Sequence, residues 1–538
     1  MNEIVYLVDG SIKKASSTNE DLEIISKSDG KRFFIKVKAL KNIVLKRAYK
    51  DLDAKFDKNT LFFLNGYQSW TDTKEFIYKE HEKNVKKLPK FLINMFSFDR
   101  YGDASFYSYS KNKFHGYDVF YTKGSNEFFS FNHNYKNAYL IYEVYKKEGT
   151  ISLSSDVNSK ELKENEEFVI FDYSIYKNLK DGFEAFYKEF PQKEIEKEFG
   201  YTSWYNYYQN INSEIILRDL ESLDNRFNLF QIDDGYEEFV GDWLKIDKNK
   251  FPDGLKPIVD KIHEKGYKAG IWLAPFVAEE KSDLFTNHKE LFKRDSTSEF
   301  VKCGANWSGF YALDFENEKA KEYIKKCLQY YIDLGFDFFK LDFLYAISLP
   351  EYKGKTKSMV AEEAYTFIRE ILKDKLILGC GATLANSINR FDYLRIGPDV
   401  SLKFNDVWYM KFMHRERIST KVTLQNTIYR SIFNRHLFGN DPDVFLLRKD
   451  NISLSKEQKE ALILINSLFG SVLMTSDNIS DYDNEADALL EEAFDIFYNA
   501  KNVVYYRNGK YIDILYNLNG KQKRLVYNTR KGVMTYGR

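Results

Sequence analysis

Acidic side chains end a series of short apolar runs along this chain, and carboxylates are the groups that cleave glycosidic bonds. The runs are FQIDDGY, FFKLDFLY, RIGPDV, GNDPDVF and LMTSD, which supply Asp233, Asp234, Asp342, Asp399, Asp441 or Asp443, and Asp477. Each run has the length of a strand, and most are separated by stretches with helical periodicity. Alternating strands and helices imply a parallel barrel, whose catalytic groups gather at the carboxyl ends of the strands. A pocket lined with carboxylates suggests sugar chemistry, in which two acids cleave a glycosidic bond.

Two of these motifs contain the residue types that a two-carboxylate mechanism needs. Lys340 and Asp342 in FKLDFLY are two residues apart, so both side chains leave a strand on the same face. A neighbouring lysine lowers the pKa of a carboxyl group and keeps it ionised, as a nucleophile requires. Arg395 and Asp399 in RIGPDV flank a Gly-Pro turn that can present Asp399 as a general acid/base. A barrel-interior ion pair and a turn-capping aspartate are the alternative readings.

Other motifs indicate groups that bind a sugar. The adjacent carboxylates of Asp233 and Asp234 in QIDDGY can accept hydrogen bonds from vicinal hydroxyls, although a simple Asp-Gly turn fits them too. Trp70 in NGYQSW can stack on a sugar face if its loop projects over the barrel mouth. Trp204 and Trp272 are similar candidates at the ends of the first and third strands. Core packing is the alternative for all three tryptophans.

The carboxylates require a scaffold, and the pattern from Tyr201 onward predicts an eight-stranded one. Amphipathic periodicity predicts helices at 317–336 and 455–470, and Ser455 with Glu457 and Gln458 resembles a helix-capping signal. Eight strand–helix units form a (β/α)8 barrel of the TIM type. The expected strands are 201–208, 229–236, 267–276, 337–343, 376–382, 393–400, 439–447 and 471–477.

The flanking regions predict all-β structure. Short runs rich in Phe, Tyr, Val and Ile before residue 180 are typical of an antiparallel sandwich. After residue 483, two Asn-Gly pairs between β-rich runs predict hairpins. We therefore expect a multidomain α/β plus all-β protein: an N-terminal β-sandwich at 1–185 that contributes a loop to the active site, a catalytic barrel at 186–482, and a small C-terminal antiparallel β domain at 483–538.

Composition excludes several classes of function. The 538 residues carry 80 Lys plus Arg and 80 Asp plus Glu, so no basic excess supports nucleic-acid binding. The longest apolar run, 461–475, is too short to span a bilayer, and the first residues lack the pattern of a signal peptide. Three scattered cysteines fit a reducing cytoplasm. The dispersed histidines predict no metal site, and no organic cofactor is expected.

Taken together, the motifs resemble glycoside hydrolase family 36, the microbial α-galactosidases. The resemblance extends over nearly the whole chain in matching order and spacing. It rests on NGYQSW, SWYNYY, QIDDGY with GDWL, GIWLAPF, YALDFEN, FFKLDF, RIGPDV and NDPDVFLLR. The segment GCGATLANSINRFD departs from the Gly-rich version of the larger members, and this departure affects the expected contacts to the sugar O2.

The resemblance implies a role for each candidate residue. Asp342 is expected to be the nucleophile and Asp399 the acid/base, while Asp233 and Asp234 bind the O4 and O6 hydroxyls. Contacts to O2 and O3 are expected from Lys340, Arg395 and the loop of Cys380. The pocket walls are expected to contain Trp70, Trp204, Tyr205 and Trp272.

The predicted function is a retaining exo-α-galactosidase that acts on α-galactoside oligosaccharides or glycosides by double displacement. An α-N-acetylgalactosaminidase and an α-galactosyl transglycosylase are the alternatives on the same fold, and a non-catalytic sugar-binding barrel is the alternative from another class. Steric crowding by Cys380 near O2 favours galactose over N-acetylgalactosamine. The sequence leaves a homo-oligomer open and predicts no nucleic-acid or membrane partner.

Overall fold

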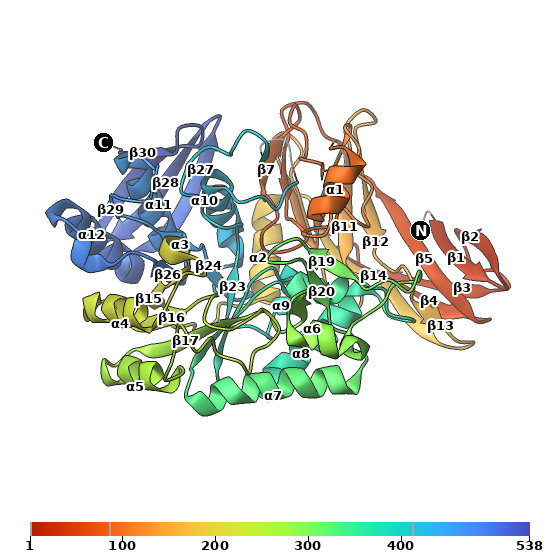
Figure 1. Cartoon of the computed structure of the whole chain (residues 1–538). Coiled ribbons are helices and arrows are strands. Elements are labelled where there is room, and N and C mark those ends of the chain that lie inside the picture. The colour runs from red at the N-terminus through yellow and green to blue at the C-terminus, as the bar shows by residue number, and fades with distance from the viewer. Residues whose placement is uncertain (1–2, 86–87, 411–413, 538) are drawn as a thin grey trace.

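The N-terminal third of the protein is a sandwich of two antiparallel seven-stranded sheets, seen in the computed structural model of Figure 1. The structure describes residues 3–85, 88–410 and 414–537. One sheet has the order β2-β1-β5-β12-β11-β8 with β13 beside β5, and the other has the order β3-β4-β14-β10-β9-β6-β7. The strands are β1 (Glu3–Val8), β2 (Ser11–Ala15), β3 (Leu22–Ser28), β4 (Arg32–Ala39), β5 (Ile43–Leu52), β6 (Leu61–Leu64), β7 (Lys74–Ile77), β8 (Lys113–Tyr117), β9 (Val119–Lys123), β10 (Phe128–Asn132), β11 (Leu140–Tyr145), β12 (Thr150–Ser155), β13 (Glu161–Leu162) and β14 (Glu167–Tyr176).

Alternation of apolar and polar side chains explains this sandwich. In β1, Ile4, Tyr6 and Val8 are buried and join a core shared by strands of both sheets. Their neighbours in the strand are less buried, as the two-residue period of a half-buried strand requires. The predicted sandwich is confirmed, and it also carries helix α1 (Lys90–Phe96) between β7 and β8. Helix α2 (Leu179–Glu189) follows the last strand.

The central sheet is parallel throughout and closes into a barrel. Its order is β24-β23-β22-β21-β17-β16-β15-β26-β25. Its members are β15 (Glu198–Thr202), β16 (Leu229–Ile232), β17 (Lys268–Leu273), β21 (Phe338–Leu341), β22 (Leu376–Gly379), β23 (Tyr393–Arg395), β24 (Gly439–Asp441), β25 (Val444–Phe445) and β26 (Val472–Thr475).

Closure occurs through the seventh strand, which is interrupted at Pro442 and Asp443. Its first half, β24, pairs with β23, and its second half, β25, pairs with β26. Proline lacks the N–H that a central strand donates, so a break at this point is the expected result. With β24 and β25 counted as one strand, eight parallel strands form the predicted (β/α)8 barrel, which is confirmed.

The two helices with predicted bounds both form, as α7 and α11, and further helices lie between the strands or follow the last one. The helices are α3 (Trp204–Tyr207), α4 (Ser213–Ser222), α5 (Lys256–Glu264), α6 (Asp283–Asn287), α7 (Glu318–Leu334), α8 (Lys357–Leu372), α9 (Leu384–Ser387), α10 (Thr420–Tyr429), α11 (Lys456–Phe469) and α12 (Asn484–Asn499). Ser455 and Gln458 form a capping box at the start of α11, as predicted. Gly335, at φ 100°, ends α7 in the left-handed conformation that glycine adopts without a steric cost.

The first predicted strand, 201–208, is wrong over most of its length. The strand β15 ends at Thr202, and Trp204–Tyr207 form the single helical turn α3. The aromatic run SWYNYY favours a strand by local propensity, but packing at the mouth of the barrel overrides that preference. The turn places Trp204 beside the pocket and its neighbour Tyr205 in the protein interior.

The fifth crossover of the barrel contains only the four-residue helix α9, and the sandwich covers this side. The hydroxyl of Tyr139 in the sandwich donates a hydrogen bond of 2.7 Å to Asn386 Oδ1 in α9. Ala385 packs among Tyr67, Tyr117 and Tyr139 of the sandwich. The loop that carries NGYQSW also lies here, so the short crossover lets it reach the carboxyl ends of the barrel strands.

Beyond the barrel, the chain ends in a four-stranded antiparallel sheet (Figure 1). Its strands are β27 (Lys501–Asn508), β28 (Tyr511–Leu518), β29 (Lys521–Asn528) and β30 (Val533–Tyr536). Both Asn-Gly hairpins form as predicted, with Gly509 and Gly520 at φ 59° and 76°. The helix α12, which follows the eighth barrel strand, precedes this sheet. The division of the chain at residues 185 and 482 stays a prediction.

Two smaller features complete the fold. A three-stranded antiparallel sheet of β18 (Val277–Glu279), β20 (Phe310–Ala312) and β19 (Lys302–Gly304) occupies the excursion between β17 and α7. Within the described ranges, no helix combines the length and apolar character that crossing a membrane requires.

Candidate active site

One pocket opens at the carboxyl ends of the barrel strands, where catalysis in this fold is expected. Eight of the eleven predicted site residues line it: Trp70, Trp204, Asp233, Asp234, Trp272, Lys340, Asp342 and Asp399. The other three, Tyr205, Cys380 and Arg395, lie behind the wall and contact residues that line it. The fold therefore brings together side chains that are as much as 329 positions apart in the sequence, from Trp70 to Asp399.

Asp342 begins the loop after β21, and N–H groups surround its carboxylate. The indole Nε1–H of Trp272 donates to Asp342 Oδ2 at 3.1 Å, and the backbone N–H of Phe343 donates to Oδ1 at 2.8 Å. Phe343 adopts φ 53°, a left-handed conformation that a bulky side chain rarely takes. These two hydrogen bonds hold the Asp342 carboxyl group in a fixed orientation at the pocket, as a nucleophile requires.

Lys340 pairs with Asp233 rather than with Asp342, its neighbour in sequence. Its Nζ lies 2.8 Å from Asp233 Oδ2, and both side chains are buried. Burial disfavours the charge on Lys340, but attraction to Asp233 and Asp342 outweighs this effect and raises its pKa. The ion pair predicted within FKLDFLY is therefore replaced by one between β21 and the end of β16, and Lys340 acts on Asp342 only through its field.

The adjacent carboxylates Asp233 and Asp234 have different partners. Asp233 Oδ2 also accepts hydrogen bonds from Thr202 Oγ1 at 3.0 Å and Gln231 Nε2 at 2.6 Å. Asp234 accepts from Trp307 Nε1 at 2.9 Å and from Gln209 Nε2 at 3.1 Å. Burial raises the pKa of Asp234, and these hydrogen bonds oppose that shift. Both carboxylates are thus fixed at the pocket wall as hydrogen-bond acceptors.

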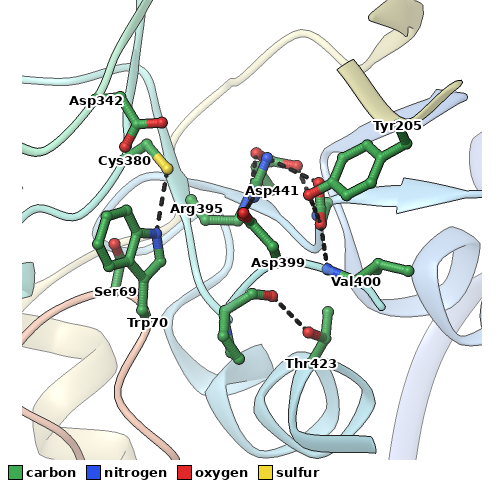
Figure 2. Close-up of polar contacts among 12 residues, drawn as sticks. Ser69, Trp70, Tyr205, Asp342, Cys380, Arg395, Asp399, Val400, Thr423 and Asp441 are labelled. Carbon is green, nitrogen blue, oxygen red and sulfur yellow. Dashed lines mark hydrogen bonds and ion pairs between the residues drawn. The ribbon is translucent and has the colours of Figure 1, made fainter. Parts of the chain in front are cut away.

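Asp399 belongs to a buried charge network centred on Arg395 (Figure 2). The guanidinium of Arg395 contacts Asp399 at 3.1 Å, Asp441 at 2.8 Å and Asp443 at 2.9 Å. The Asp399 side chain remains 36% exposed, so it is the member of the network that faces the pocket. Enclosure raises the pKa of Asp399, Arg395 opposes this shift, and the charge of Asp342 adds to it. A carboxyl group of this kind can start the reaction protonated.

Behind Asp399, Asp443 holds the network in place. It accepts hydrogen bonds from the hydroxyl of Tyr205 and from the backbone N–H of Val400, the latter at 2.7 Å. Burial raises the pKa of Asp443 to about 7. The role of Tyr205 in this geometry is to orient Asp443, because its side chain does not reach the pocket surface.

The NGYQSW loop joins β6 to β7 and reaches the barrel, where it places Trp70 in the pocket. The indole Nε1–H of Trp70 points to Cys380 Sγ at 3.3 Å, as Figure 2 shows. The backbone N–H of Ser69 donates to Ala382 O at 2.9 Å, so the loop pairs with the segment after β22. Cys380 thus contacts Trp70, which forms part of the pocket wall. Burial raises the pKa of the Cys380 thiol.

Asp477, the last of the conspicuous acidic residues, lies outside the pocket. Its carboxylate accepts from the backbone N–H groups of Leu447 and Arg448 and pairs with the Arg448 guanidinium at 2.8 Å. It stabilises the loop after β25. Position at a strand end is therefore not sufficient to identify a site residue.

The further residues that line the pocket were not predicted from the sequence, and most of them lie on long loops. They are Phe98, Tyr101, Asn306, Trp307, Phe343, Pro398, Met410, His414, Glu416, Arg417 and Ile418. Trp307 had a usable signal, because a tryptophan within the turn-forming sequence ANWSG is unlike a core residue. The charged run HRER at 414–417 has no sequence signal of a site, because charged runs are usually exposed to solvent. In the described part of the chain, no group of three or more His, Cys, Asp or Glu side chains is arranged to hold a metal ion.

Comparison with known proteins agrees with this architecture. The melibiase family model matches residues 196–375. The α-galactosidase Mel36A of Lactobacillus acidophilus is 36% identical over 69 residues, which cover 12% of this chain and 9% of that protein. The curated relatives are therefore matched over a small part of their length.

Solved structures match the whole fold. The α-galactosidase TtGalA from Thermus thermophilus, in complex with p-nitrophenyl α-D-galactopyranoside, superposes with a TM-score of 0.71 at 22% identity, over 96% of this chain and 98% of that one. The GH36 α-galactosidase AgaA from Geobacillus stearothermophilus gives a TM-score of 0.64 at 11% identity, over 97% and 80%. The melibiase match and the fold shared with these α-galactosidases support the resemblance to glycoside hydrolase family 36.

Proposed function

We propose that this protein is a retaining exo-α-galactosidase that removes terminal α-linked galactose by double displacement. The observation that supports it best is the pair of carboxyl groups with opposite surroundings in one pocket. Asp342 receives two N–H donors, whereas Asp399 is enclosed and repelled by Asp342. A carboxyl group whose pKa is raised suits the acid of such a mechanism, and a carboxyl group held by N–H donors suits the nucleophile.

The proposed reaction follows from these states. Asp342 attacks the anomeric carbon while Asp399 gives its proton to the glycosidic oxygen, and the leaving group departs. In the resulting ester Asp342 has lost its charge, so the repulsion that raised the pKa of Asp399 disappears. Asp399 then takes a proton from water, which attacks the anomeric carbon from the opposite side. Two inversions give net retention.

Asp233 and Asp234 support galactose as the sugar. Their carboxylates can accept hydrogen bonds from the axial O4 and from O6, and Trp307 and Lys340 hold them in that position. The equatorial O4 of glucose points away from this pair and leaves a buried acceptor without its partner. Sites built around a hydroxyl reject analogues that misplace it by factors on the order of 10⁴.

A substrate comparison tests the proposal. Nitrophenyl α-galactoside, α-glucoside and α-N-acetylgalactosaminide are given to one preparation of the enzyme, and kcat/KM is measured for each. We expect the galactoside to be the best substrate of the native enzyme. The Asp234→Ala variant should lose the preference for the galactoside over the glucoside. Comparable rates on galactoside and glucoside in the native enzyme would contradict the O4 argument. Faster turnover of the N-acetyl substrate would contradict only the choice at O2.

We also place the enzyme in the cytoplasm. Cys303, Cys327 and Cys380 are all buried and unpaired with one another, which suits a reducing compartment. Fractionation of the cells that produce the protein, followed by immunodetection, tests this assignment.

A further inference from the structure

A second cavity lies at the opposite end of the barrel from the active pocket. Its volume is about 680 Å³, and among the described residues it shares no lining residue with the pocket that contains Asp342. Lys197 directly precedes β15, Arg435 lies in the loop before β24, and Gly470 lies just before β26. These positions are the amino ends of parallel strands, whereas the active pocket opens at their carboxyl ends. The second cavity can therefore hold a ligand of its own.

Three parts of the fold meet at this cavity, and their aromatic side chains form its walls. Tyr121 comes from the sandwich, Phe183 and Tyr187 from helix α2, and Tyr505 from β27 of the C-terminal sheet. The rings of Phe183 and Tyr187 are stacked with centroids 5.9 Å apart, and Phe469 of α11 packs edge-on against Tyr505 at 6.2 Å. Clefts between domains that have aromatic walls and a few polar groups are the usual binding places of small molecules. Flat aromatic faces also suit the apolar face of a sugar ring.

Arg435 and Lys197 bring two positive charges to this cavity without a carboxylate to balance them. Within the described part of the chain, neither side chain forms an ion pair, and the buried Nε of Arg435 has no hydrogen-bond acceptor. The Lys197 ammonium donates only to the backbone oxygen of Phe497 and lies 4.9 Å from the centre of that ring. Burial and the neighbouring charge of Arg435 lower the pKa of Lys197 to about 8. Because buried charges are normally paired, two cations side by side indicate an anion that arrives with a ligand.

The backbone of Arg435 is held in a conformation that side chains rarely adopt. Its φ is 63°, in the left-handed region that favours glycine. Its N–H donates to Phe438 O at 2.8 Å, and its carbonyl oxygen accepts from the N–H of Lys193 at 2.6 Å. Strained residues of this kind persist where the surrounding structure fixes them, and they cluster at sites that hold ligands. The fold thus fixes the point from which the guanidinium enters the cavity.

Glu75 adds a hydrogen-bond acceptor that lacks a donor. The residue is 1% exposed and lines the cavity. Its Oε1 accepts a hydrogen bond of 3.0 Å from the hydroxyl of Tyr121, but its buried Oε2 has no donor among the described residues. Buried polar atoms are nearly always hydrogen-bonded, so this oxygen indicates a hydroxyl group of a ligand. The cavity therefore calls for a molecule that has both an anionic group and hydroxyl groups.

We propose that this cavity is a second binding site, remote from the active pocket, for a phosphorylated sugar. Arg435 and Lys197 contact the phosphate group, whose three terminal oxygens can accept from both cations at once. A hydroxyl of the sugar donates to Glu75 Oε2, and the ring lies against the aromatic walls. The inference concerns binding alone, so it stands apart from the reaction proposed for Asp342 and Asp399.

Isothermal titration calorimetry with three probes tests the site on the native protein. Glucose 6-phosphate should bind, and an excess of galactose should leave its affinity unchanged, because the active pocket is a separate cavity. Inorganic phosphate should bind about tenfold more weakly or worse, since it lacks the hydroxyl for Glu75 and the apolar ring. Glucose, which lacks the anion, should bind more weakly than glucose 6-phosphate. No binding of glucose 6-phosphate, equal binding of inorganic phosphate, or displacement by galactose would each overturn the inference.

Substitutions then assign the binding to this cavity. Arg435→Gln should weaken the affinity for glucose 6-phosphate about 10- to 100-fold, the effect of one lost charged hydrogen bond. Lys197→Gln should do the same and keeps the test open if Arg435→Gln is poorly folded. Glu75→Gln should weaken the binding of glucose 6-phosphate but not that of inorganic phosphate.

The matched control is Lys523→Gln, which removes a positive charge from an exposed position of β29 outside the cavity. It should leave the affinity for glucose 6-phosphate unchanged. Circular dichroism of every variant checks that its fold is native. Native affinity in a folded Lys197→Gln or Arg435→Gln protein, or an equal loss in Lys523→Gln, would show that the phosphate does not bind at this cavity.

Discussion

At the scale of single residues, the site separates two chemically identical carboxyl groups by their surroundings. Asp342 accepts N–H groups from Trp272 and from the strained turn at Phe343. Asp399 shares Arg395 with two further carboxylates, and both enclosure and the charge of Asp342 raise its pKa. Each group thus suits one half of the proposed mechanism.

Removal of Asp342, the proposed nucleophile, should stop the natural reaction. In Asp342→Gly no covalent intermediate can form, and hydrolysis of oligosaccharide substrates should be lost. Azide added to an activated aryl α-galactoside should enter the vacated space and give the β-galactosyl azide, which NMR identifies from its anomeric coupling. Turnover at the native rate in this variant would show that another group is the nucleophile.

The loss of activity on removal of Asp399, the proposed acid/base, should depend on the leaving group and on pH. In Asp399→Ala, substrates with poor leaving groups should lose the most activity, because they need protonation. A raised pKa keeps the native Asp399 protonated up to higher pH, and kcat/KM should decline as the pH rises through that pKa. This alkaline decline should vanish in the variant when an activated aryl galactoside is the substrate. Equal losses for all leaving groups would indicate a positioning role instead.

At the scale of elements, the loop between β6 and β7 becomes part of the barrel mouth. Trp70 packs edge-on against Phe343 and Tyr345, with ring centroids 5.3 and 5.7 Å apart. Gly381 makes room for it, because a Cβ there would lie 3.0 Å from the indole, and its φ of 59° also favours glycine. The tryptophan is therefore both a wall of the pocket and a contact between two domains.

Substitutions of Trp70 should separate these two roles. Trp70→Phe keeps most of the packing but loses the N–H that points to Cys380, and should raise KM while the melting temperature changes little. Trp70→Ala should also lower the free energy of unfolding by about 3–5 kcal/mol, as for other buried large aromatics. Denaturant titrations and steady-state kinetics on the same preparations measure both effects. Unchanged KM in both variants would exclude Trp70 from the substrate site.

At the scale of the whole molecule, one buried arginine joins the sandwich to the barrel. Arg430, just after α10, donates to Asn65 Oδ1 at 3.2 Å, Gln68 O at 3.1 Å and Ser69 O at 2.5 Å in the sandwich loop. It also donates to Ile396 O at 2.8 Å, after β23. Its guanidinium thus couples the Trp70 loop to the strand that leads to Asp399.

Loss of this coupling should affect stability and catalysis together. Arg430→Leu leaves several buried carbonyl groups without a donor, each of which costs about 1–3 kcal/mol. We expect a lower free energy of unfolding and a fall in kcat/KM on nitrophenyl α-galactoside at a temperature where the variant is folded. Arg507→Leu, at a half-buried contact between the C-terminal sheet and Glu75 of the sandwich, is the control and should change kinetics little. A destabilised variant with native kinetics would show that the arginine only stabilises the interface.

The order of the elements and the position of the carboxylates along them can be predicted from the sequence. Eight strands, the capping box of α11 and both Asn-Gly hairpins follow from local rules: apolar periodicity, side-chain caps and turn preferences. Asp342 and Asp399 follow from the same rules, because a parallel barrel brings the ends of all its strands to one face. Only local information is needed for each of these inferences.

Which side chains contact one another depends on the tertiary structure and cannot be predicted from the local sequence. Lys340 pairs with Asp233 because β16 and β21 are alternate strands of the barrel, separated by β17, and alternate strands fill the same interior layer. Trp307 and Glu416 reach the pocket on loops whose sequences have no periodicity to read. The closing contact of Trp70 with Cys380 joins residues 310 positions apart. Such partners depend on how the whole chain packs, so the sequence pattern around each residue does not contain them.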